Sequence, residues 1–130
     1  MKRVMCLFLV VAAGSCFAAT AEDLKGILID EKCSGKADLR ISGATGLLEG
    51  GRIVAEAHTK ECLLMPECQK SGYGIYTNDD KFLKFDEAGN RKALALIKES
   101  KKLDDFEIEI VGEVKGDMVK VVSIKLLPEN

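Results

Sequence analysis

The side chains best suited to metal or thiol chemistry concentrate in one short segment. His58 is the only histidine of the sequence, and it begins the run HTKECLLMPEC, which contains Cys62 and Cys68. A further cysteine, Cys33, lies upstream. Thiolate and imidazole donors suit zinc, and soft sulfur ligands also suit Cu(I). The sequence therefore predicts a site that binds a metal ion, zinc or copper, or a small ligand through Cys33, His58, Cys62 and Cys68.

A helix would bring two of these residues together. Residues 53–63 contain good helix formers, and the spacing of His58 and Cys62 by four residues would place both on one helical face. Pro66 ends the helical pattern, and a turn there would let Cys68 fold back as a third donor. The upstream cysteine, at the end of an expected strand, would then complete a Cys₃His tetrahedron.

Two other interpretations fit the same residues. The spacing His-x₃-Cys-x₅-Cys lacks the paired C-x₂-C of zinc knuckles, and cysteines of an exported protein commonly form disulfides. A bond from Cys33 to Cys62 or Cys68 would make the protein a disulfide-stapled structural or interaction module, whose surface binds a protein or an oligosaccharide. A catalytic Cys62 activated by His58 is the third interpretation, but the sequence identifies no orienting group or oxyanion site for it. We therefore expect binding without catalysis.

The N-terminus predicts export. Residues 1–3 are positively charged, residues 4–13 are apolar, and the small residues 19–21 suit a leader peptidase, so residues 1–21 are expected to be a signal peptide. The apolar run is too short for a membrane-spanning helix. Cys16 follows a run that resembles a lipobox, so a lipid anchor on Cys16 is the alternative. Both interpretations place the mature chain in the periplasm or outside the cell, where disulfides persist.

The charge balance narrows the class of partner. Removing residues 1–21 from the 130-residue chain leaves 130 − 21 = 109 residues, and the 19 basic residues fall to 17 against 21 acidic ones. The resulting net charge of 17 − 21 = −4 disfavours nucleic acid as the partner. We expect a protein or small-molecule partner, and one domain over residues 22–130.

The remaining pattern predicts five strands and two helices. Residues 24–29, 72–77 and 81–85 read as strands, the last two forming a hairpin through 78–80. A second helix is expected over residues 90–100, with Asn90 or Asp86 as its cap. Alternating apolar residues from 106 onward and the run 118–127 predict two further strands, with Gly112 suited to a bulge or bend.

This order of elements is that of a small Greek-key barrel. An insertion of about residues 31–71 follows the first strand, and one helix separates the third strand from the fourth. Five strands with a helix in that position match the OB-fold, which is mainly β with some α. Closure into a barrel would also protect the sheet edges. A small α+β sheet with both helices on one face is the alternative.

Four short motifs together resemble a group of small exported bacterial proteins that have no assigned function. The first is Gly-x-Leu-x-Asp-x-x-Cys, at Gly26, Leu28, Asp30 and Cys33. The second is His-x₃-Cys-x₅-Cys-x₂-Ser-Gly-Tyr-Gly, from His58 to Gly74. The others are Lys-Phe-Asp-x-x-Gly-Asn at 84–90 and Val-x-Gly-x-x-x-Gly-Asp, which corresponds to Val111, Gly112, Gly116 and Asp117. The resemblance implies an extracytoplasmic domain in which the Cys and His residues act together, and it implies no activity.

Overall fold

A computed structural model describes residues 20–37 and 55–128 of the chain. Residues 1–19 of the expected leader, including Cys16, lie outside the described residues. Residues 38–54 of the insertion also lie outside them. Within the described ranges no helix has the length and apolar character needed to cross a membrane.

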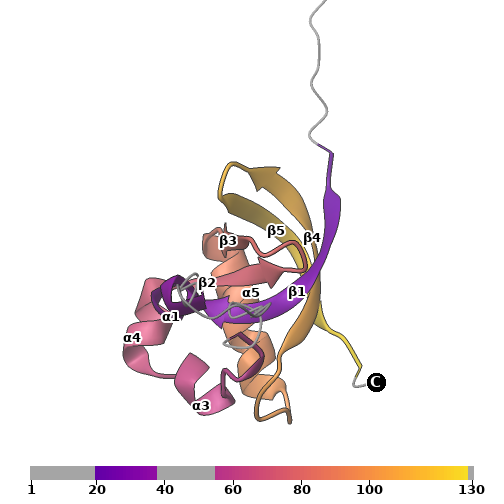
Figure 1. Cartoon of the computed structure of the whole chain (residues 1–130). Helices are drawn as coiled ribbons and strands as arrows, with labels where there is room; N and C mark the ends of the chain where they lie inside the picture. Colours follow the sequence, from indigo (N-terminus) through magenta and orange to yellow (C-terminus); the bar gives the residue numbers. More distant parts are fainter. Residues whose placement is uncertain (1–19, 38–54, 129–130) are drawn as a thin grey trace, which may run out of the picture.

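Five strands close into a barrel (Figure 1). They are β1 (Glu22–Asp30), β2 (Tyr73–Thr77), β3 (Phe82–Phe85), β4 (Glu107–Lys115) and β5 (Met118–Leu126). The order around the barrel is β1-β2-β3-β5-β4, and β4 pairs with β1 to close it. Only the short β3–β5 pair is parallel. The structure thus confirms a small OB-like barrel, and the alternative of an open sheet with helices on one face is wrong.

The inner core follows from the alternation seen in the sequence. In β4, Ile108 and Ile110 are fully buried while the alternating Glu107 and Glu109 are partly exposed, as expected for a strand with one face toward a core. A register shift between Val111 and Gly112 marks the irregularity expected there.

Helix α5 (Glu87–Glu99) packs against β5 and contributes to this core. Asp86 is its cap: the carboxylate accepts hydrogen bonds from the N–H of Gly89 at 2.9 Å and from that of Val121 in β5 at 3.1 Å. Asn90, the other candidate cap, lies inside the helix and accepts a hydrogen bond from the N–H of Tyr73 at 2.7 Å. One carboxylate therefore both starts α5 and attaches it to the barrel.

A second, smaller core lies on the outer face of β1 and β2. Its buried members are Ile27, Ile29, Cys33, Ala55 and Tyr76. Residues from the insertion therefore cover the barrel wall, which is why the last five residues of β1 and all of β2 are buried on both faces. This double burial explains how a polar residue in β1 can lie away from water.

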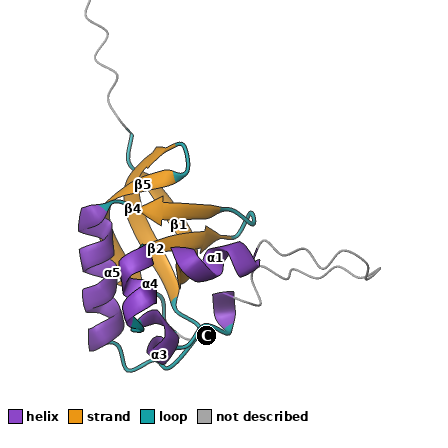
Figure 2. Ribbon diagram, turned by 90° about the vertical axis from the view of Figure 1, so that its left-hand side faces the viewer, coloured by secondary structure: helices purple, strands orange, loops and turns teal. Residues whose placement is uncertain are grey.

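Three short helices of the insertion gather at one end of the barrel (Figures 1 and 2). They are α1 (Glu31–Ala37), α3 (Lys60–Leu63) and α4 (Pro66–Ser71). The continuous helix expected over residues 53–63 is wrong, because Ala55 and Glu56 are helical but the chain leaves the helix before His58. Thr59 is extended, and its hydroxyl accepts a hydrogen bond from the N–H of Cys62 at 3.2 Å, so it begins a new helix instead of continuing one.

Helix α3 is held at both ends by hydrogen bonds to other parts of the fold. The Tyr73 hydroxyl donates to the carbonyl of Leu63 at 2.6 Å, and Lys60 donates its backbone N–H to Leu103 at 2.7 Å. Pro66, expected only to end a helix, occupies the first turn of α4, where a missing N–H costs nothing. The segment that carries the cysteines is thus held in place on both sides of α3.

Candidate metal site

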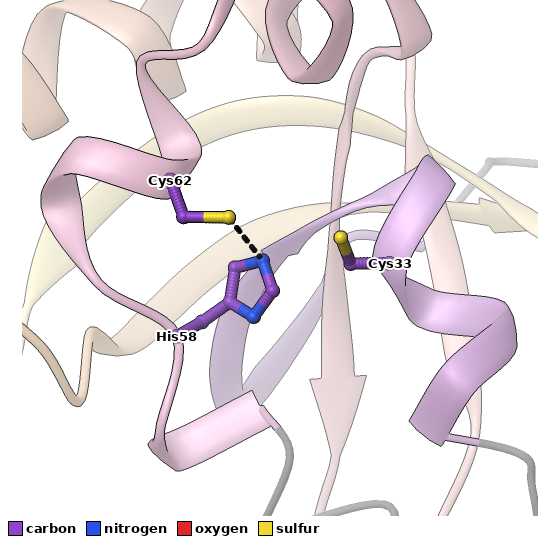
Figure 3. A group of neighbouring side chains, drawn as sticks. All are labelled: Cys33, His58 and Cys62. Carbon is purple, nitrogen blue, oxygen red and sulfur yellow. Dashed lines mark hydrogen bonds between the residues drawn. The ribbon is translucent and has the colours of Figure 1, made fainter.

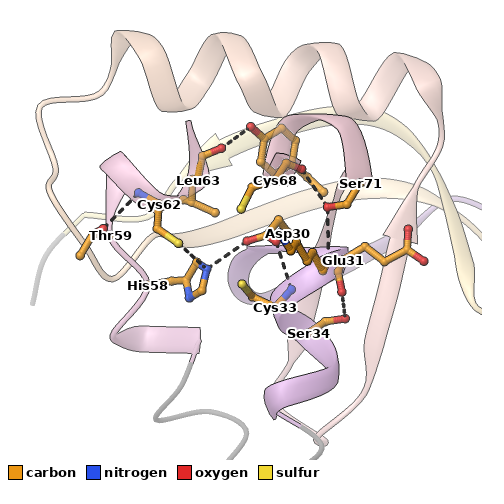
Figure 4. Close-up of polar contacts among 12 residues, drawn as sticks. Asp30, Glu31, Cys33, Ser34, His58, Thr59, Cys62, Leu63, Cys68 and Ser71 are labelled. Atoms are coloured by element: carbon orange, nitrogen blue, oxygen red, sulfur yellow. Dashed lines mark hydrogen bonds and ion pairs between the residues drawn. The ribbon is translucent and has the colours of Figure 1, made fainter. Parts of the chain in front are cut away.

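Asp30 is the last residue of β1 and lies at the centre of the site (Figure 4). By the alternation of strand side chains it shares the inward face of Leu28. Its side chain is fully buried. One carboxylate oxygen, Oδ2, accepts the N–H of Cys33 at 3.1 Å, the bond of an N-cap, so Asp30 also begins α1. The cap in turn places Cys33 at the third position of that helix.

Three donor atoms converge (Figure 3), and the imidazole among them contacts this carboxylate (Figure 4). They are the Sγ atoms of Cys33 and Cys62 and the imidazole of His58, and all lie within 4.8 Å of one another. The Nε2 atom of His58 is 3.4 Å from the Sγ of Cys62. Cys33 comes from α1, His58 from the extended segment before α3, and Cys62 from α3 itself. We call these three residues the outer group.

A second cluster uses the same Cys33 sulfur. The Sγ atoms of Cys33 and Cys68 and a carboxylate oxygen of Asp30 also lie within 4.8 Å of one another. All three residues are buried, whereas His58 and Cys62 are partly exposed. We call Asp30, Cys33 and Cys68 the inner group. Cys68, which the sequence placed in one tetrahedron with the other three, thus belongs to a separate cluster that is joined to the outer group through Cys33.

Neighbouring groups stabilise the charged form of Asp30. Burial acts to raise the pKa of this carboxyl, but the hydrogen bond and charge of His58 lower it, aided by the Cys33 N–H and the Cys68 thiol. The pKa of Asp30 therefore falls below its ordinary value of 3.8. A fully buried residue thus carries a carboxylate at neutral pH.

The Cys68 thiol is shaped by its burial next to Asp30. Burial, and then the charge of Asp30 and the hydrogen bond to it, raise the pKa of the Cys68 thiol to about 12. Burial and the Asp30 carboxylate likewise raise the pKa of Tyr73 to about 12. Cys68 therefore remains a protonated thiol that donates to Asp30 in the metal-free protein.

The sequence identified the metal-binding donors, but it did not identify Asp30 as the residue at the centre of the site. Cys33, His58 and Cys62 come together as expected, although His58 lies before its helix and not on it. No disulfide joins Cys33, Cys62 or Cys68. The sequence pointed to Asp30 only as a member of the Gly-x-Leu-x-Asp-x-x-Cys motif. The available signal for its role was a carboxylate at the end of the apolar run LKGILI, three residues before a cysteine.

Comparison with models of protein families, with curated proteins and with solved structures finds no match to this chain. The resemblance to small exported bacterial proteins therefore stays a prediction, and the chemistry of the site is argued from its own geometry.

Proposed function

We propose that the protein binds a single thiophilic metal ion through the outer group, Cys33, His58 and Cys62. The observation that carries the proposal is the convergence of two sulfurs and one imidazole within 4.8 Å. These donors come from separate segments of the chain. The N-cap bond from Cys33 to Asp30 positions one of them, and the short helix α3 positions Cys62. Zinc and Cu(I) both accept this combination of ligands.

The contacts of His58 favour metal binding over nucleophilic catalysis. In a Cys-His or Ser-His catalytic site, one ring nitrogen faces the nucleophile and the other faces the orienting carboxylate. Here the same atom, Nε2, lies 3.4 Å from the Cys62 sulfur and 3.0 Å from the Asp30 carboxylate. A single nitrogen that lies close to both the sulfur and the carboxylate is the arrangement that an ion between them requires.

The expected export gives the ion a further role. Residues 1–21, if they act as a signal peptide, would deliver this site to an oxidising compartment. A bound ion there would protect Cys33 and Cys62 from oxidation. The stapled module is the competing outcome, since the Cys33 sulfur lies within 4.8 Å of the sulfurs of both other cysteines.

Elemental analysis tests the proposal. The 130-residue chain is expressed and purified anaerobically without chelator, and its metal content and free thiols are measured together. We expect one equivalent of zinc or copper, with all three thiols of the domain free after the metal is removed. His58→Gln and Cys62→Ser should each weaken binding at least about 100-fold, because each removes a direct ligand.

Glu61→Gln is the matched control, because Glu61 is an exposed neighbour of Cys62 on the same short helix. It should bind metal as the wild type does. A protein that carries one intact disulfide and takes up no metal after reduction would refute the proposal and favour the stapled module.

A further inference from the structure

The Nε2 atom of His58 has two partners that an ion would have to share. It lies 3.0 Å from Oδ1 of Asp30 and 3.4 Å from the sulfur of Cys62. This is the ring nitrogen that contacts the Cys62 sulfur, so it is the one that would bind an ion in the outer group. Metal binding at Nε2 would therefore change the hydrogen bonding of Asp30.

A ring nitrogen that coordinates a metal cannot at the same time donate a hydrogen bond. Ion binding at His58 would thus remove the hydrogen bond to Asp30 Oδ1. Asp30 is fully buried, and its other contacts are the Cys33 N–H, which meets Oδ2, and the Cys68 thiol. A buried charged oxygen that loses a hydrogen-bond partner keeps the full cost of its removal from water, so the lost bond needs a replacement. The ion itself is the natural replacement.

The two distances from the Nε2 atom of His58 are close to those of a tetrahedral zinc site. Around a tetrahedral zinc ion with ordinary bond lengths, a nitrogen and an oxygen ligand lie about 3.4 Å apart, and a nitrogen and a sulfur ligand about 3.6 Å apart. The corresponding separations here are 3.0 Å for His58 and Asp30 and 3.4 Å for His58 and Cys62. For these two pairs an ion would therefore change the separation by only a few tenths of an ångström. Among the described residues no cluster within 4.8 Å holds Asp30 together with all three residues of the outer group, so the Asp30 side chain would also have to shift toward them.

We propose that Asp30 is the fourth ligand of the ion held by Cys33, His58 and Cys62, and that its oxygen makes the site select zinc over Cu(I). This inference rests on the metal site proposed above. Cys68 then remains a thiol donor that orients Asp30 and does not ligate the ion. The ligand set becomes Cys₂HisAsp in place of the Cys₃His expected from the sequence.

Charge and donor type both support the selectivity. Two thiolates and one carboxylate carry three negative charges, so a divalent ion leaves a net charge of −1 while a monovalent ion leaves −2 in a largely buried site. A larger uncompensated charge is more costly to bury. Carboxylate oxygen is an accepted zinc ligand, whereas Cu(I) is selected by soft sulfur donors.

X-ray absorption spectroscopy of the zinc-loaded protein tests the ligand set directly. We expect two sulfur and two nitrogen or oxygen neighbours around zinc. Cys68→Ser should leave the count at two sulfurs, and Cys62→Ser should reduce it to one. Three sulfurs in the wild type would overturn the assignment of Asp30 while leaving the proposed metal binding intact, so the two failures are distinguishable. Loss of zinc from all preparations would refute the metal site itself.

Competition titrations test the selectivity. Asp30→Asn keeps an oxygen that can accept the Cys33 N–H, and it should lower zinc affinity at least about 100-fold while changing Cu(I) affinity less than about threefold. Glu31→Gln is the matched control, since it converts the adjacent carboxylate, which pairs with Lys84 at the surface. Its zinc affinity should match the wild type. Equal losses of zinc and Cu(I) in Asp30→Asn would overturn the selectivity. If that variant does not fold, the sulfur count in the wild type decides the proposal.

Discussion

Replacing His58 by alanine in the metal-free protein should destabilise the fold through Asp30. The imidazole lies 3.0 Å from a carboxylate whose side chain is fully buried, while the His58 side chain itself is only 11% exposed. A hydrogen bond to a charged group contributes about 1.5–3 kcal/mol. Asp30 keeps the Cys33 N–H and the Cys68 thiol, so the loss should stay below the 3–5 kcal/mol or so of a fully broken buried ion pair. We expect about 2–3 kcal/mol.

Urea and thermal unfolding in the presence of chelator and reductant would measure this loss. A difference of that size corresponds to a fall in Tm of roughly 10 °C for a domain of this length. His58→Gln offers an amide N–H near the position of Nε2 and should cost less than about 1 kcal/mol. The exposed Arg91→Ala control breaks the surface pair with Glu87 and should cost no more than about 0.5 kcal/mol.

The loss should also depend on pH with a definite sign. His58 is among the groups that lower the pKa of Asp30 below 3.8, so this part of the stability is present above about pH 4 and is lost as the pH falls through the lower, folded-state value. The difference between wild type and His58→Ala should therefore shrink as the pH falls below about 4 and through the lowered pKa of Asp30. Equal costs for the alanine and glutamine variants, or a difference that does not change with pH, would refute the assigned role of Asp30.

Two further predictions concern thiol reactivity and the barrel wall. Iodoacetamide should alkylate Cys62 at least about 100-fold faster than Cys68, because burial and the neighbouring carboxylate raise the pKa of Cys68 to about 12. Peptide mass mapping at timed intervals measures both alkylation rates, and equal rates would contradict the environment assigned to Cys68. Gly74→Ala should cost about 3 kcal/mol, because a Cβ there would lie 2.4 Å from a backbone oxygen of the neighbouring strand. Gly116→Ala, at a positive φ in an open turn, should cost about 1 kcal/mol, and unfolding midpoints that rank the two glycine variants in reverse would contradict the packing.

The sequence determined the barrel because its strand pattern is local. Alternation of Ile108 and Ile110 with Glu107 and Glu109 sets which face of β4 is buried, and an aspartate before a helical stripe sets the start of α5. The order of these elements then leaves few ways to close a sheet, and the structure has the expected one. The same local reasoning failed before Cys62, where a Thr59 cap outweighed helix propensity.

The donor types were also readable from the sequence, but their grouping was not. Residue spacing predicts neighbours within a turn or two, and it brought His58 and Cys62 together correctly in spite of the wrong helix. Asp30 and His58 are 28 residues apart, and their contact exists only because the insertion folds back over the end of β1. Because that strand is buried on both faces, Asp30 is a buried carboxylate that lies between the imidazole of His58 and the thiols of Cys33 and Cys68. The sequence by itself thus determined which atoms could bind a metal. The tertiary structure decided which of these atoms face one another, because only long-range packing can remove a charged group from water and surround it with hydrogen-bond donors.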